Sequence, residues 1–380
     1  MSKVESYEGA IDRGLEGIVA CSSAISTIHG STLLYRGYTI EDLAEHATFE
    51  EVIHLLWRGT IPNAEELAEL RTRLGANMKL PEEMRVWLVG MPVKVHPMDF
   101  LSAVVAGLTL HDPEANVIHE AATRSKATRL TARLGVIVGA YEQARKGRWP
   151  LEPDPNRSLS WNLLRGITGK APTPQQERDF DVCLILHADH ELNASAFSAR
   201  VTASTLSGLY SSVLAAIGTL KGPLHGGANQ AVIAMLRQIG SLDRVDRWLD
   251  DALARDEKIM GFGHRVYKDG DPRAKVLKKM SERLTSEVGR PELYRMSVRL
   301  EERMAEKKGL IPNVDFYSAT VYEALGIPDD LFTAIFAASR VVGWCAHVME
   351  QYENNRIYRP RARYVGPTEA RYAESRGTDR

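Results

Sequence analysis

The sequence predicts an all-α protein with a minor β-hairpin near its N-terminus. Helix signals recur along most of the chain, whereas only residues 25–38 have a strand-like pattern, with a turn at residues 30–31. The chain has 380 residues, of which 44% are apolar and 26% are charged, as in ordinary globular proteins. This length accommodates roughly two domains and a large core.

Helix caps mark three helices in the first half of the chain. Thr48 and Glu51 have capping-box spacing, and Gly59 ends the apolar pattern that follows. Asn63 caps the next expected helix, and Thr173 begins a cap–proline–glutamine pattern. Further helices are expected over residues 98–110, 126–146, 195–220, 227–239, 243–255, 272–288, 291–308, 313–325 and 328–352.

Charge and cysteine content restrict the class of protein. The chain has 48 basic and 49 acidic side chains and a net charge of −1, which does not favour nucleic-acid binding. Its three cysteines, Cys21, Cys183 and Cys345, are far apart and form neither a disulfide framework nor a CxxC zinc pattern. Residues 1–10 lack the apolar core of a secretory signal. We therefore expect a protein of the reducing cytoplasm.

One uncharged stretch, residues 201–220, is long enough to cross a membrane. Serine and threonine supply seven of its twenty residues, and Arg200 and Lys221 flank it closely. These features favour a buried central helix over a membrane span.

Two histidines lie between glycines in loops that precede helical stretches. His225 lies in GPLHGGAN (222–229), and His264 lies in GFGHRVYKDGDPR (261–273). Glycine lets a ligand approach the backbone closely, and a helix start directs free N–H groups toward it. A helix dipole next to His225 favours a neutral imidazole that can polarise a carbonyl. The loops predict two imidazoles facing one anionic substrate, although a plain tight-turn role for His225 stays open.

The segment HADHELN (187–193) allows three interpretations. His187 and His190 share a helix face, and Cys183 one turn earlier completes a conceivable metal site. Alternatively, the segment is a helix end where one histidine caps carbonyl groups. The third interpretation is an anion-binding histidine at the end of a buried helix.

Three charged side chains stand in positions that suit a site for an anion. Arg273 follows His264 closely, and an arginine fork holds carboxylates by two parallel hydrogen bonds. Asp315, in PNVDFYS (312–318), is a stabilising helix N-terminal charge if taken alone. Beside two histidines and several arginines it becomes a candidate general base. Arg340 lies in a strongly apolar helix, so it needs either a partner carboxylate or an anionic ligand.

These motifs together resemble those of the citrate synthase family. The matches run in order through LLYRGYTIEDLA (33–44), HADHELN, GPLHGGAN, GFGHRVYK with DPR, PNVDFYS, Arg340 and the Arg-Pro-Arg at 359–361. They span almost the whole chain, and the last five are highly specific as a set. The length of the chain and its lack of an extended N-terminal region resemble the shorter, dimeric bacterial and archaeal type.

The resemblance implies a fold, a reaction and a set of site residues. The fold has a large helical domain, residues 1–225 and 327–380, and a smaller inserted helical domain, residues 226–326. The reaction condenses acetyl-CoA with oxaloacetate and hydrolyses citryl-CoA to citrate and CoA, at the entry to the tricarboxylic acid cycle, with no metal or bound cofactor. The implied residues are His225, His264 and Asp315 as the catalytic triad; His190, Arg273, Arg340 and Arg359 as oxaloacetate and citrate ligands, with Arg359 contributed by the partner subunit of a homodimer; and Arg265, Lys268 and Lys308 as CoA contacts.

Three alternatives stay open at this point. A 2-methylcitrate synthase shares the motifs and accepts propionyl-CoA, and one methylene group changes binding in an apolar pocket by only ~1–3 kcal/mol. Arg265 and Lys268 in GFGHRVYK favour citrate synthase. A metal-dependent hydrolase built on Cys183, His187 and His190 is the alternative from another class. The third is a helical scaffold without catalytic activity.

Overall fold

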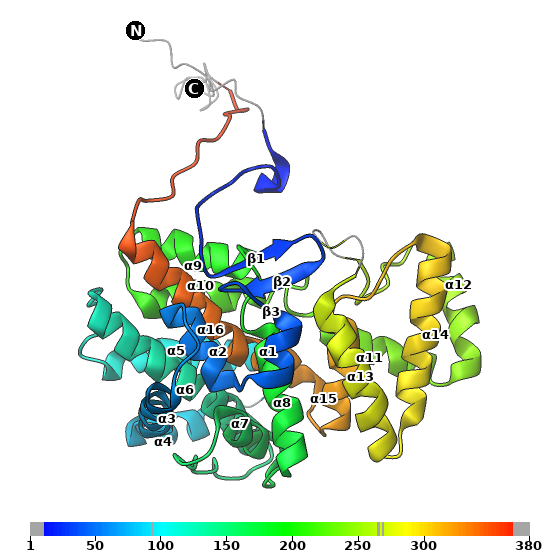
Figure 1. Ribbon diagram of the computed structural model, residues 1–380, viewed down its shortest axis with the longest axis horizontal. Coiled ribbons are helices and arrows are strands. Elements are labelled where there is room, and N and C mark those ends of the chain that lie inside the picture. Colours follow the sequence, from blue (N-terminus) through cyan, green and yellow to red (C-terminus); the bar gives the residue numbers. More distant parts are fainter. Residues whose placement is uncertain (1–10, 93, 264–266, 268–269, 368–380) are drawn as a thin grey trace, which may run out of the picture. The chain divides into compact units, whose positions relative to one another are not determined.

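The computed structural model describes residues 11–92, 94–263, 267 and 270–367, and helices dominate this part of the chain (Figure 1). The α-helices are α1 (Ile40–His46), α2 (Phe49–Arg58), α3 (Ala64–Met78), α4 (Glu82–Gly90), α5 (Pro97–Leu108), α6 (Glu120–Arg145), α7 (Leu159–Thr168), α8 (Pro174–His187), α9 (Ala194–Ser204), α10 (Leu209–Leu220), α11 (Ala228–Ile239), α12 (Val245–Ala254), α13 (Pro272–Glu287), α14 (Pro291–Lys308), α15 (Val314–Ala324) and α16 (Phe332–Glu353). Short 3-10 helices occur at η1 (Arg13–Leu15), η2 (Thr109–His111), η3 (Leu242–Arg244) and η4 (Asp329–Leu331). The all-α prediction is confirmed.

The described residues form two compact units. One consists of the terminal segments 11–22 and 357–367, and the other is Ser23–Arg356. Within the larger unit, helices α11 to α15 pack mainly on one another, and they occupy the range expected for the small domain. The expected domain boundaries at residues 226 and 326 stay a prediction.

The predicted hairpin is confirmed and has a third strand. Strands β1 (Ser26–His29) and β2 (Thr32–Tyr35) pair antiparallel, and Ser26 lies opposite Tyr35. Gly30 makes the turn with φ 61°, a left-handed conformation that glycine adopts at little steric cost. Strand β3 (Tyr38–Thr39) adds to the free edge of β2.

The three predicted caps begin helices where the sequence indicates. Thr48 and Glu51 form a capping box at α2, and Gly59 ends that helix in the left-handed conformation. Asn63 at α3 and Thr173 at α8 make the same reciprocal bonds. Each of these side chains accepts a hydrogen bond from a backbone N–H group of the first helical turn that has no carbonyl partner within the helix.

The expected single helix over residues 195–220 is wrong, because the chain breaks there into α9 and α10. Ser204, Thr205 and Ser207 turn their hydroxyl groups back onto carbonyl oxygens of the last turn of α9. Those bonds satisfy carbonyls that a continuing helix would have used. Gly208 then takes φ 94°, which ends any helical path before α10 begins. The helix expected over residues 126–146 starts earlier in the structure, because α6 begins at Glu120.

Helix α16 forms the centre of the larger unit. It packs against α2, α6, α8, α9, α10 and α11 (Figure 1). Residues 329–353 are long and apolar enough to cross a membrane, but their most apolar window is entirely buried within the fold, as in a core helix. Arg340 therefore lies on a helix that is surrounded by the rest of the unit.

Candidate active site

Two predicted site residues, Arg340 and His225, meet His187 around the ring of Phe336 on α16. The guanidinium carbon of Arg340 lies 4.7 Å from the centre of that ring. The ring centres of His187 and His225 lie 4.9 and 6.3 Å from it. The end of α8, the loop before α11 and the middle of α16 are thus brought together from distant parts of the sequence.

His225 lies in a tight turn two residues before the N-cap of α11. Its N–H group donates to the carbonyl oxygen of Gly222 at 2.9 Å, and the helix starts at Ala228. Burial, followed by the positive charge of Arg340, lowers the pKa of His225 to about 4. The neutral ring expected from the sequence agrees with this structure, but burial rather than the helix dipole is its main cause.

A serine hydroxyl holds the far side of the His225 ring. His225 Nε2 lies 2.8 Å from Ser195 Oγ, which also accepts the indole N–H of Trp344 at 3.0 Å. Ser195 has one hydroxyl proton, and Asn193 Oδ1 at 2.8 Å competes with His225 for it. When the proton points to His225, the ring carries its own proton on Nδ1. The imidazole is then a neutral donor at the atom opposite Ser195.

Asp315 is a half-buried residue in the first turn of α15. Asn313 caps this helix and accepts the Asp315 N–H at 3.0 Å, so the carboxyl group itself is not used as the cap. Its Oδ1 is buried without a hydrogen-bond partner among the described residues. Burial raises the pKa of Asp315 to about 7, against the opposing charge of Arg273. A carboxylate with this pKa can take up a proton near neutral pH.

Arg273, at the N-terminus of α13, is held by a neighbouring acid. Its Nε and Nη2 donate to the two carboxylate oxygens of Asp271 at 3.0 and 2.8 Å, and both side chains are buried. Burial acts to lower the pKa of Arg273, but the charge and hydrogen bonds of Asp271 raise it above the usual value. Asp271 also caps α13 and accepts the N–H of Val314 at 3.0 Å. One carboxylate therefore orients Arg273 and ties α13 to α15.

Arg340 is buried without a carboxylate partner. Its Nε donates to the carbonyl oxygen of His187 at 2.7 Å, and no acidic group of the described residues lies within ion-pair distance. Burial lowers the pKa of Arg340 to about 10, so the guanidinium is still charged at neutral pH. The internal ion pair that the sequence left open is thus not found in the described part of the chain. An anionic ligand would satisfy this charge.

His190 follows α8 in a turn and points toward Tyr267. His190 Nε2 lies 3.2 Å from the Tyr267 hydroxyl oxygen, and the two rings meet edge to face. His187, three residues earlier, turns the other way, and its Nδ1 lies 2.8 Å from the carbonyl oxygen of Cys183. The carbonyl-capping interpretation therefore holds for His187, whereas His190 faces other side chains.

Five predicted residues receive no place in this arrangement. His264, Arg265 and Lys268 lie outside the described residues. Arg359 belongs to the terminal unit, and Lys308 is exposed at the end of α14. Their predicted roles stay predictions.

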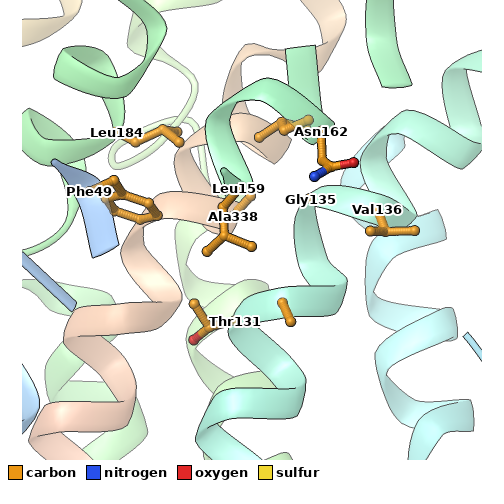
Figure 2. A pocket seen from close by; sticks show the side chains of 10 residues that line it. Phe49, Thr131, Gly135, Val136, Leu159, Asn162, Leu184 and Ala338 are labelled. Atoms are coloured by element: carbon orange, nitrogen blue, oxygen red, sulfur yellow. The ribbon is translucent and has the colours of Figure 1, made fainter. Parts of the chain in front are cut away.

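A small cavity between α2, α6, α7, α8 and α16 is separate from these residues. Figure 2 shows the side chains that line it, among them Phe49, Thr131 and Leu184. Its volume is about 10 Å³, and none of the predicted site residues lines it. It has room for no more than about one water molecule, so it is a packing defect of the core and not a substrate site.

Comparison with known proteins identifies the family. Residues 14–361 match the family model described as "Citrate synthase, C-terminal domain". The chain is 50% identical over 361 residues to citrate synthase 2 of Bacillus subtilis (strain 168), an alignment that covers 95% of this chain and 97% of that protein. The chain belongs to the citrate synthase family.

Two further comparisons bear on the fold and the substrate. The solved ternary complex of carboxymethyl coenzyme A and oxaloacetate with citrate synthase from Thermoplasma acidophilum is 35% identical, covers 96% of this chain and 98% of that one, and gives a TM-score of 0.90. The 2-methylcitrate synthase of Shewanella oneidensis is 44% identical over 371 residues, 96% of this chain and 97% of that protein. This member of the citrate synthase family has the family's all-α fold and is an enzyme that transfers an acyl group to make citrate.

The metal-site alternative finds no geometric support in this citrate synthase family member. The part of the chain that the structure describes contains no group of three His, Cys, Asp or Glu side chains placed to hold a metal ion. Cys183 is buried, and burial raises the pKa of its thiol well above the usual value. Its backbone carbonyl oxygen lies 2.8 Å from His187 Nδ1.

Sequence patterns do not single out Ser195, Trp344, Tyr267 or the pairing role of Asp271. Ser195 and Trp344 are 149 residues apart, and no spacing rule connects them. One signal was available for Ser195. Asn193 has the spacing of a helix cap, since its side chain accepts the N–H of Ala196, and this places Ser195 in the first turn of α9.

Proposed function

We propose that this enzyme condenses acetyl-CoA with oxaloacetate and hydrolyses the resulting citryl-CoA to citrate and CoA. The observation that carries the proposal is Asp315, whose Oδ1 is buried without a partner among the described residues and whose pKa is about 7 despite the charges of the buried Arg273 and Arg340. That combination suits removal of a weakly acidic proton next to an anionic co-substrate.

Asp315 is the proposed base for the methyl group of the thioester. As the carboxylate takes the proton, negative charge develops on the thioester oxygen. His225, neutral and with a proton on Nδ1, would donate a hydrogen bond to that oxygen and stabilise the enol. Ser195 would select this tautomer when its single hydroxyl proton points to Nε2 instead of to Asn193 Oδ1. A neutral donor avoids leaving a charged imidazolium buried next to Arg340.

The arginines are the proposed ligands of the two carboxylates of oxaloacetate. Arg340 has a buried positive charge without an acidic partner among the described residues, and Arg273 is fixed in orientation by Asp271. Each guanidinium can form two parallel bonds to a carboxylate. His190 would bind an oxaloacetate oxygen from the turn after α8. His264, through its matched motif, is the proposed donor to the ketone oxygen as the carbon–carbon bond forms.

We propose a homodimer of the cytoplasm that needs neither a metal nor a bound cofactor, in which Arg359 completes the partner subunit's site. All three cysteines are free thiols, as suits a reducing compartment. Mixing Arg359→Ala and His225→Ala subunits tests the shared site. Each heterodimer has one site with both defects and one with neither, so activity should return on mixing. Demonstrated subunit exchange without recovery would contradict a shared site.

The deciding experiment is thiol release from acetyl-CoA with and without oxaloacetate, on protein dialysed against a chelator. We expect release only with oxaloacetate and no loss after dialysis. Thiol release that does not depend on oxaloacetate, or that is lost after dialysis against the chelator, would overturn the proposal. The same assay with propionyl-CoA decides the substrate. A higher kcat/KM for propionyl-CoA than for acetyl-CoA would assign the 2-methylcitrate reaction instead.

A further inference from the structure

A buried chain of polar side chains lies directly behind the turn that carries His190. Its first member is Asp189, which is fully buried. Ser26 of β1 donates its hydroxyl proton to Asp189 Oδ2 at 2.5 Å and accepts the N–H of Glu191 at 2.7 Å. Tyr35 of β2 donates to the Asp189 carbonyl oxygen at 2.7 Å and accepts the Asp189 N–H at 3.0 Å. The hairpin therefore holds the backbone on both sides of His190.

Helix α16 extends this chain on the other side of Asp189. His347 Nε2 lies 3.3 Å from Asp189 Oδ2, and Arg200 Nε donates to His347 Nδ1 at 3.0 Å. Because Nδ1 accepts this bond, the ring proton of His347 lies on Nε2, which is within ion-pair distance of Asp189 Oδ2 but is not aligned for a hydrogen bond to it. Arg200 is buried and forms an ion pair with Glu350, whose other oxygen accepts the N–H of Ala24 at 2.8 Å.

The turn is also packed against α16 more tightly than a side chain would allow. Gly343 N–H donates to the Ala188 carbonyl oxygen at 3.1 Å. A Cβ atom on Gly343 would lie 2.4 Å from Asp189 Oδ1 and 2.5 Å from that carbonyl oxygen. Next in the turn, Glu191 has φ 50°, a conformation that non-glycine residues rarely adopt. Strain of this kind persists only where neighbouring groups fix the backbone, and Ser26 does so here.

Buried polar groups are costly to keep unless each has a partner, so a chain of this length calls for a reason. It connects the N-terminal hairpin, α9 and α16, and all three converge on one residue of the turn. We propose that Asp189, held by His347 and Arg200, is a positioning residue that sets the His190 side chain for oxaloacetate. This inference rests on the proposed function, in which His190 binds that substrate.

Substitution of His347 gives the sharpest test, because one replacement keeps the contacts and another removes them. A glutamine amide can accept from Arg200 and donate to Asp189, whereas leucine can do neither. We expect His347→Leu to raise the KM for oxaloacetate about tenfold, as for loss of one bond to a charged group. His347→Gln should stay within about threefold, and the KM for acetyl-CoA should stay within about twofold in both.

Two controls separate positioning from general destabilisation. Cys345→Ala removes a buried side chain two residues away on the same helix and should leave both KM values unchanged. Ser26→Ala removes the contact that the hairpin makes with Asp189. It is tested in place of His347→Leu if His347→Leu does not fold. The inference is overturned if the folded variant keeps the parental KM for oxaloacetate, if both KM values rise together, or if glutamine behaves as leucine does.

Direct binding keeps this test independent of turnover. Oxaloacetate binding by calorimetry should weaken by the same factor as the KM rises. If the unsubstituted protein shows no oxaloacetate-dependent thiol release, the proposed function fails. If it is active and the Ser26 and His347 variants bind oxaloacetate as it does, only the positioning role fails.

Discussion

The N-termini of α13 and α15 each hold an aspartate with a buried carboxylate oxygen, but the two acids are used in opposite ways. Asp271 caps its own helix and forms an ion pair with Arg273. At α15 a separate residue, Asn313, does the capping, and this leaves Asp315 without a partner on one oxygen. The residue that caps each helix therefore decides which acid is structural and which is free for chemistry. Pairing fixes a carboxylate in its charged form, whereas burial without pairing raises its pKa toward neutrality.

The largest expected effect follows from removing the free acid. Asp315→Asn keeps the size of the side chain and removes the base, so kcat should fall about 10³-fold, within the range for general base catalysis. The Kd for oxaloacetate should change by less than about twofold, since the arginines remain. Steady-state kinetics and calorimetry measure the two quantities. A kcat within a few-fold of the parent would show that Asp315 is not the base.

Removing the paired acid should instead damage stability. Asp271→Ala leaves Arg273 as a buried charge without its partner and uncaps α13, which should cost about 3–5 kcal/mol of unfolding free energy. Urea denaturation measures this cost. Asp315→Asn serves as the control, because it removes an acid of the same type from the neighbouring helix without breaking an ion pair. Equal losses of stability in the two variants would contradict the distinction between the acids.

The raised pKa of Asp315 predicts a pH-dependent gain in stability on substitution. Between the unfolded value near 4 and the folded value of about 7, the native protein binds more protons at this site than the unfolded chain does. Stability from this group is therefore present at low pH and lost as the pH rises through about 7. Asparagine avoids that loss, so the stability of Asp315→Asn relative to the parent should be higher at pH 8 than at pH 5 by about 2–3 kcal/mol. A difference that does not change with pH would mean that Asp315 titrates normally.

Much of the helical framework follows from local patterns in the sequence, but the use of each acid does not. The caps at Thr48 and Thr173 are read directly from spacing, because each bond connects residues three positions apart. Asp315 also stood out as an acid in a helix first turn. What local patterns cannot show is whether another residue nearby in space neutralises it. Ser195 beside His225 is a second case, since the fold alone brings those residues together.

The smallest expected effect concerns the cap that leaves Asp315 free. Asn313→Ala removes the bond to the Asp315 N–H and should cost about 1 kcal/mol of stability, as for other N-caps. Thr173→Ala at α8 removes a cap of the same strength far from the site and is the matched control. Because Asn313 also donates to the carbonyl oxygen of Gly263 at 3.1 Å, its loss loosens the first turn that positions Asp315. Only Asn313→Ala should therefore lower kcat, by about five- to tenfold, while the two variants show similar urea midpoints. If both substitutions lower stability and neither lowers kcat, the position of Asp315 does not depend on its cap. Burial by the surrounding helices is then sufficient to keep the acid in place.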